Sequence, residues 1–137
     1  MLVDAALKKF NTVILFGYHG KLIKLAGGIF HTHNHLADGR IEILVYLAVK
    51  EKIPPEIIAR LSHFNTIEEA SIFLEKFSKS IAEKLFQNLS NTIEKRSFAY
   101  VNRYIKTDMQ IAAIIFDRKR KIRWAGIYGN KYISYFR

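Results

Sequence analysis

Histidines cluster in one short segment of this 137-residue chain. His31, His33 and His35 occupy alternating positions, and Asp38 follows shortly after them. Alternate side chains of a strand point to one face, so the three imidazoles can converge on a metal ion, with His19 or Asp38 completing the site. The turn-forming residues around the histidines favour a loop instead. In a loop, one of these histidines can hydrogen-bond a ligand or act as a base, because its pKa lies near neutrality.

Glycines come just before the histidines in two places. Gly17 and Gly20 enclose a short segment that follows an apolar run, and Gly27 and Gly28 are adjacent. Glycine allows positive φ angles and lets the backbone come close to a ligand, although a tight turn has the same requirements. Because α/β proteins bind ligands where a buried strand ends, the first pair is a candidate ligand-binding loop.

Two lysines lie between the glycine pairs. Lys21 and Lys24 are three residues apart in a short helical segment, so they are expected to share a face of the helix. Two interpretations remain open for them. They either hold the carboxylates or phosphates of a ligand, or they are solvated surface side chains.

The elements that position these residues are predicted from the spacing of apolar side chains. The run Thr12 to Phe16 is apolar on both faces, which predicts a strand in the middle of a parallel sheet. A helix over residues 3–10 precedes it, and a short helix begins at Lys21. After the histidines, Asp38 is expected to be the N-cap of a helix over residues 39–52.

The rest of the chain continues the alternation of helices and strands. Pro55 and the capping box Thr66 to Glu69 each start a helix, and a long helical pattern runs over 78–106. The sequence then predicts strands over 111–116 and 122–128 and a final edge strand over 132–136. We therefore expect one domain over residues 1–137, of α/β class, with a mostly parallel buried sheet flanked by helices and an antiparallel strand pair at the C-terminal end.

The bulk composition narrows the function classes. The formal net charge is +10, which suits nucleic acid, an anionic membrane or a ligand with carboxylates or phosphates. The chain has no cysteine, which excludes disulfides, thiolate zinc sites and cysteine nucleophiles. No secretory segment or long apolar span is present in the sequence, so a cytoplasmic protein without a membrane partner is expected.

One segment resembles a known family. The sequence GYHGKLIKLAGGIFHTHNHLADGRIEIL is similar to a segment of the cobalt-precorrin-5B carbon-1 methyltransferases of cobalamin biosynthesis, the CbiD family. That family has a buried strand, then Gly-His-x-Gly-Lys-Leu-x-Lys-Leu, two small residues, Thr-His and Ala-Asp. Tyr18 stands where the family has its first histidine, and His19 follows one place later. The later segments ARLSHFNTIEEA and IAAIIFDR also fit, so the resemblance covers nearly the whole chain and corresponds to the C-terminal part of the family.

The resemblance implies transfer of a methyl group from S-adenosylmethionine to a ring carbon of a cobalt-precorrin. Cobalt arrives as part of that substrate, so no metal site of the protein is required. His33 or Asp38 would handle the proton lost or shifted as the ring carbon attacks the methyl group. The implied contacts with the methyl donor are those of Gly17, His19, Gly20, Gly27, Gly28 and Thr32. The implied contacts with the substrate are those of Lys21, Lys24 and His31.

The resemblance also implies partners for this chain, and two other interpretations of its function stay open. Members of the family are considerably longer than this chain, so we expect a separate N-terminal subunit or a homo-oligomer, besides the anionic corrinoid substrate. The main alternative is a non-catalytic basic module, in which the turn over 118–123 holds a nucleic-acid backbone while Trp124 and Tyr128 stack on bases. Nucleic acid is the less favoured partner, because no known nucleic-acid-binding motif is present. A third interpretation is a metal-binding histidine protein.

Overall fold

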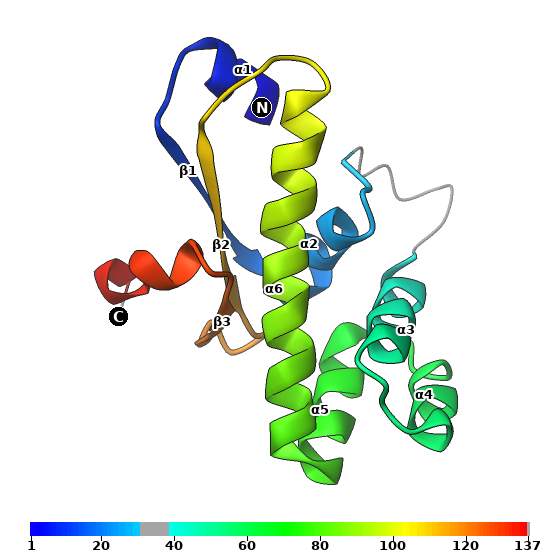
Figure 1. Ribbon diagram of the computed structural model, residues 1–137. Coiled ribbons are helices and arrows are strands. Elements are labelled where there is room, and N and C mark those ends of the chain that lie inside the picture. The colour runs from blue at the N-terminus through cyan, green and yellow to red at the C-terminus, as the bar shows by residue number, and fades with distance from the viewer. Residues whose placement is uncertain (31–38, 137) are drawn as a thin grey trace.

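The long helix α6 (Lys79–Asn102) runs through the centre of the molecule and separates the sheet from most of the other helices (Figure 1). The computed structural model describes residues 1–30 and 39–136. The other helices and strands are α1 (Leu2–Leu7), β1 (Thr12–Tyr18), α2 (His19–Ala26), α3 (Arg40–Lys50), α4 (Pro55–Leu61), α5 (Ile67–Phe77), β2 (Gln110–Phe116) and β3 (Ile122–Ala125). Two short 3₁₀ helices follow, η1 (Gly129–Lys131) and η2 (Ile133–Phe136).

The sheet confirms the α/β class and the antiparallel C-terminal pair. Its order is β1-β2-β3, with β1 parallel to β2 and β2 antiparallel to β3. One pairing of each kind makes the sheet mixed rather than mostly parallel. The prediction that β1 lies in the middle was wrong, because β2 is the central strand of the described sheet and its residues Ile111 to Ile115 are all buried.

Helix α6 supplies much of the core. Its apolar stripe contains Leu85, Leu89 and Ile93, which pack in one cluster with side chains of β2 and of helices α2, α3 and α5. The helix begins where the sequence predicted, because Ser78 Oγ accepts a hydrogen bond from the backbone N–H of Ile81 (3.3 Å). It ends at Asn102, a little before the predicted end at residue 106.

The starts of the neighbouring helices agree with the sequence in part. The Thr66 cap is confirmed, because Thr66 Oγ1 accepts a hydrogen bond from the backbone N–H of Glu69 (3.1 Å). Helix α3 begins at Arg40 with Gly39 as its N-cap, at a φ of 72°. The N-cap position predicted for Asp38 is therefore taken by Gly39, and Asp38 lies outside the described residues.

The C-terminal segment differs most from the prediction. Strand β3 ends at Ala125 rather than residue 128, and residues 133–136 form the 3₁₀ helix η2 instead of an edge strand. This segment turns back over the outer face of the sheet. The ring of Phe136 stacks on that of Phe16 in β1 (centroids 4.9 Å apart), and Tyr132 Oη donates a hydrogen bond to Gln110 Oε1 (3.3 Å). Across the described part of the chain, no helix is both long enough and apolar enough to span a bilayer.

Candidate functional site

The first candidate site is the corner where β1 becomes α2, at the carboxyl end of the parallel strands. The strand continues to Tyr18 and the helix starts at His19, so there is no glycine loop between them. Gly17 lies in the strand and Gly20 in the first turn of the helix. A Cβ at Gly20 would lie 2.7 Å from Cε1 of Tyr18, so glycine is needed here for packing. The sequence predicted the place of the corner but not its geometry.

His19 is buried at this corner and is 0% exposed. Its Nε2–H donates to Glu68 Oε2 (2.8 Å), while Nδ1 has no hydrogen-bond partner in the described structure. The ring packs beside Tyr18 and faces the stacked pair Phe86 and Trp124. Burial lowers the pKa of His19 more than its bond to Glu68 raises it. The imidazole is therefore neutral at pH 7 and fixes the corner, without an open path to a ligand.

The basic turn after β2 is tied into the same end of the sheet. Asp117 Oδ1 accepts hydrogen bonds from the backbone N–H groups of Lys119 (2.8 Å) and Lys121 (3.1 Å). Arg123 donates to Asp117 Oδ2 (3.3 Å) and also forms an ion pair with Glu75. Burial alone would raise the pKa of Asp117, but the backbone N–H of Lys121 and the Arg123 guanidinium hold it below its usual value.

Trp124 is not available for stacking on a nucleic-acid base. Its indole is 3% exposed and lies between the ring of Phe86 (centroids 4.2 Å apart) and the guanidinium of Arg123 (4.7 Å). Arg123 is neutralised by two carboxylates. The nucleic-acid alternative therefore loses the tryptophan on which its stacking argument depended, although the tip of the turn and Tyr128 remain exposed.

The lysines and glycines of α2 have unequal exposure. Lys21 is exposed, whereas Lys24 is 6% exposed, so the two do not present equivalent ammonium groups to solvent. Gly27 and Gly28 are exposed at the C-terminal end of α2, and Gly28 has a φ of 78°, which favours glycine. Of the predicted contacts that the structure describes, Lys21, Gly27 and Gly28 are exposed, Gly17 is half-buried, and the others are buried.

Several predicted site residues lie outside the described residues: His31, Thr32, His33, His35 and Asp38. Their expected roles remain predictions. Among the residues that the structure does describe, no group of three or more His, Asp or Glu side chains is placed to hold a metal ion.

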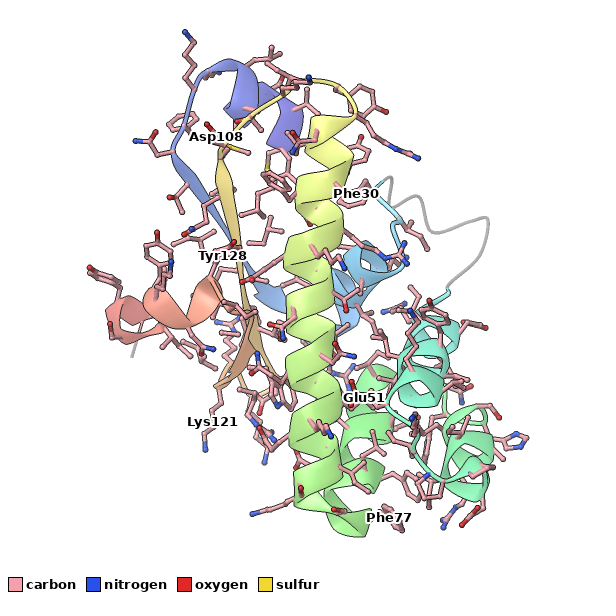
Figure 2. All side chains as sticks on the ribbon, in the orientation of Figure 1. Phe30, Glu51, Phe77, Asp108, Lys121 and Tyr128 are labelled. Atoms are coloured by element: carbon pink, nitrogen blue, oxygen red, sulfur yellow. The ribbon has the colours of Figure 1, made fainter. Side chains whose placement is uncertain are left out.

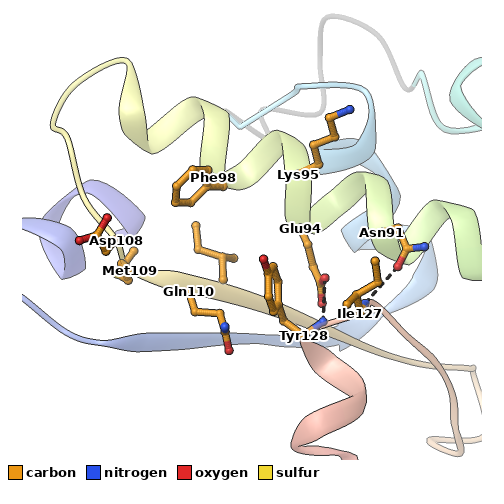
Figure 3. Close-up of a pocket in the computed structure, with 10 residues that line it drawn as sticks. Asn91, Glu94, Lys95, Phe98, Asp108, Met109, Gln110, Ile127 and Tyr128 are labelled. Atoms are coloured by element: carbon orange, nitrogen blue, oxygen red, sulfur yellow. Dashed lines mark hydrogen bonds between the residues drawn. The ribbon is translucent and has the colours of Figure 1, made fainter.

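A cleft lies on the sheet side of α6, away from the glycines (Figure 3). It has a volume of about 490 Å³ and opens between α6, the start of β2 and the segment after β3. Its walls are mainly apolar, with Phe98, Met109 and Ile127 among the lining residues. Nothing in the sequence pattern pointed to this cleft, because its walls come from segments far apart in the chain.

Glu94 sits at the base of this cleft and is 4% exposed. Its Oε1 accepts hydrogen bonds from the backbone N–H groups of Ala113 (2.9 Å) and Gly129 (2.8 Å). Its Oε2 accepts one from Tyr128 (3.1 Å), as Figure 3 shows. With three backbone donors on one carboxylate, Glu94 joins α6, β2 and η1 and is a structural group rather than an acid or base.

Comparison with known proteins identifies the family of the chain. A family model described as CbiD, C-terminal domain, matches residues 31–126. The chain belongs to the CbiD C-terminal domain family. The match extends from the histidine segment through α3 to α6 and ends one residue after β3.

Several curated relatives of this CbiD domain share the same name. The chain is 80% identical over 136 residues to a cobalt-precorrin-5B C(1)-methyltransferase of Prochlorococcus marinus strain MIT 9312, covering 99% of this chain and 37% of that protein. Relatives of the same name share 69% identity in the strain CCMP1986, over 100% of this chain and 37% of that protein, and 45% in the strain MIT 9303, over 98% and 35%. No solved structure matches the chain. The family resemblance is confirmed, and the CbiD domain spans little more than a third of the length of these relatives.

Beside the exposed glycines, the CbiD domain has a second feature that sequence reasoning missed. A hollow of about 280 Å³ is lined by Gly27, Gly28 and Phe30, by Arg96, Ala99 and Tyr100 of α6, and by Arg103, the C-cap of that helix. The rings of Phe30 and Tyr100 stack with centroids 4.1 Å apart. Arg96 and the C-cap Arg103 are seven residues apart, a helical repeat that could have drawn attention to this face.

Proposed function

We propose that this CbiD domain is the C-terminal part of a cobalt-precorrin-5B C(1)-methyltransferase of cobalamin biosynthesis. The observation that carries the proposal is the 80% identity to a protein of that name, maintained over 99% of the chain. The domain would take part in transfer of a methyl group from S-adenosylmethionine to a ring carbon of a cobalt-precorrin. A cytoplasmic location is part of the same proposal.

Methyl transfer chiefly requires that the protein align the methyl donor with the ring carbon. The ring carbon forms a bond to the methyl carbon while the bond from methyl to sulfur breaks, and the sulfur leaves as a neutral thioether. Two reactants held in line react far faster than free ones, so no covalent nucleophile of the protein is needed. A proton is then lost or shifted within the macrocycle, and we assign that proton to His33 or Asp38.

The surroundings of the glycines fit a methyl donor. Gly27 and Gly28 are exposed beside Phe30, an aromatic side chain that suits contact with an adenine ring. Thr32 remains a proposed donor contact. The donor would supply the electrophilic methyl group when bound.

The residues of the corner take a supporting part in this proposal. Gly17, Gly20 and His19 pack the junction of β1 and α2, and through α2 they position the exposed end that carries Gly27 and Gly28. Lys21 and His31 are assigned to carboxylates of the substrate. Lys24, which is largely buried, would help to position that end of α2.

A chimera tests the function directly. In the relative from strain MIT 9312, the segment that matches this chain is replaced by the chain, and the purified protein is given cobalt-precorrin-5B and S-adenosylmethionine. We expect a product heavier by one methylene unit, formed at a rate comparable to that of the unaltered relative. A His33→Ala chimera should lose most of this turnover. A folded chimera that makes no methylated product, beside an active unaltered relative, would contradict the proposal.

A titration of S-adenosylmethionine into the 137-residue chain asks a separate question. Saturable one-site binding in a calorimeter would place the donor contacts within this domain. Lys21→Ala should then leave donor affinity unchanged, because Lys21 is assigned to the substrate. Absence of heat with this chain, together with an active chimera, would assign the donor site to the rest of the enzyme.

A further inference from the structure

Helix α6 presents a row of cations on the side that faces α3. Lys95 and Arg96 lie next to each other on this face, and Arg103 lies about two turns further along. From α3, Lys50 lines the same hollow as Lys95 and Arg96, which has a volume of about 460 Å³. We name this hollow, together with the smaller one beside Gly28, the basic groove.

The two hollows are adjacent along α6, since Arg96 and Ala99 line both of them. The groove faces α3 and the end of α2, the side of α6 where Figure 2 labels Glu51 and Phe30. Lys121 and Tyr128 are labelled on the opposite side, with the sheet.

The charges of the basic groove are unbalanced. No aspartate or glutamate is among the described residues that line either hollow. Within the described structure, none of the four cations is paired with a carboxylate, although the Lys50 ammonium lies over the ring of Tyr46 (5.3 Å to the centroid). Glu51, which follows Lys50, instead accepts a hydrogen bond from the Asn88 amide (2.7 Å) and ties α3 to α6.

This arrangement favours a ligand with several separated negative charges. A helix rises 1.5 Å per residue, so the cations from Lys95 to Arg103 span about 12 Å. A small anion reaches one or two of them, whereas a wide ring with carboxylates at its edge reaches all of them at once. The aromatic walls at Tyr46 and Tyr100 offer apolar contact to the body of such a ring.

We propose that the basic groove binds the carboxylate side chains of the macrocyclic substrate, so that the ring lies along α6 beside the exposed Gly27–Gly28 turn. The proposal rests on the proposed function for the identity of the ligand, and on the groove for its place. It puts the acceptor next to the assigned donor contacts, which methyl transfer requires.

The test uses uroporphyrin III, a fluorescent tetrapyrrole with carboxylates around its edge, titrated with the 137-residue chain and followed by fluorescence anisotropy. The variant Lys95→Gln/Arg96→Gln removes two groove cations, and glutamine preserves helix propensity. The matched control, Arg118→Gln/Lys119→Gln, removes the same two residue types from exposed positions of the turn after β2. Circular dichroism verifies that both variants keep the helix content of the wild type.

We expect the groove variant to bind about tenfold more weakly and the control to stay within about twofold, since exposed ion pairs each contribute a few-fold to affinity. Cyanocobalamin, a corrinoid whose side chains are amides, should bind more weakly than uroporphyrin III and should not respond to the groove substitutions. Equal losses of affinity in the groove variant and in the control would show that binding depends only on the net charge of the chain. This result would overturn the proposal.

Two other results would also overturn it. Unchanged binding by the groove variant would place the ring elsewhere on the chain, and a wild-type chain that binds no uroporphyrin III would remove the site altogether. Neither result touches the proposed function, which the chimera tests by product formation. If the chimera makes no methylated product but the basic groove binds uroporphyrin III as expected, the groove is a polycarboxylate site in a domain that lacks the proposed methyltransferase function.

Discussion

Replacing Glu94 by alanine should remove much of the stability of this domain. The substitution removes the acceptor of three buried or half-buried backbone N–H groups, those of Ala113, Tyr128 and Gly129. Hydrogen bonds to a charged group contribute about 1.5–3 kcal/mol each, and the cleft admits water that offsets part of the loss. We expect the free energy of unfolding to fall by about 4 kcal/mol, a large part of the roughly 5–15 kcal/mol typical of a domain.

Urea denaturation followed by the fluorescence of Trp124, the single tryptophan, measures this change. A loss of that size lowers the midpoint by about 2 M, for a slope near about 2 kcal/mol/M. Glu94→Gln retains one carbonyl oxygen but turns an NH₂ group toward a backbone N–H, so it should lose about half as much.

Gly126 provides an internal control for the Glu94 argument. A Cβ at Gly126 would lie 2.1 Å from Cδ of Glu94, so Gly126→Ala should destabilise the wild type. In the Glu94→Ala background the carboxyl group is gone, and the same substitution should cost about 1 kcal/mol less. If Glu94→Ala loses less than about 1 kcal/mol, or if the two substitutions are additive, the carboxylate does not join these segments as described.

Two further predictions concern the corner and a helix cap. Burial holds the pKa of His19 below its unfolded value of about 6.5, so the unfolded chain binds the proton more tightly and the free energy of unfolding should decline as pH falls below about 6.5. His19→Asn should flatten this decline between about pH 7.5 and 5.5. If the free energy of unfolding falls with pH equally steeply in the wild type and in His19→Asn, His19 is not the group responsible. Thr66→Ala removes the acceptor of the Glu69 N–H and should cost about 1 kcal/mol, or about 3 °C in Tm, whereas Thr66→Ser should keep the cap. Equal Tm values for Thr66→Ala and Thr66→Ser would exclude a role for the Thr66 hydroxyl.

Local signals predicted the local parts of the fold. Ser78 and Thr66 cap their helices because the acceptor and the donor are only three residues apart, within one turn. The apolar runs of β1 and β2 were recognised for the same reason. The place of β1 at the edge was not, because the ring that packs on its Phe16 is that of Phe136, from the other end of the chain.

The C-terminal segment shows where sequence reasoning reaches its limit. Residues 132–136 have the composition of a strand, yet Glu94 binds the first N–H groups of η1 and turns the chain into helical form. The basic groove could not be predicted for the same reason, because its cations come from α3 and α6, which are far apart in the sequence. Gly27 and Gly28 are exposed at the end of α2, and their contact with the methyl donor stays a prediction.

The parallel pairing of β1 with β2 has a consequence for how the domain forms. Thr12 pairs with Gln110, so helices α2 to α6 all lie between the two strands in the chain. Contacts between residues so far apart cost loop entropy before they stabilise anything, and chains dominated by them fold slowly. During synthesis, the apolar and β-prone segment Thr12–Tyr18 leaves the ribosome long before its partner strand. Until α6 and β2 arrive, that segment is exposed to pairing with other chains, and low expression temperature or chaperones should raise the yield of folded domain.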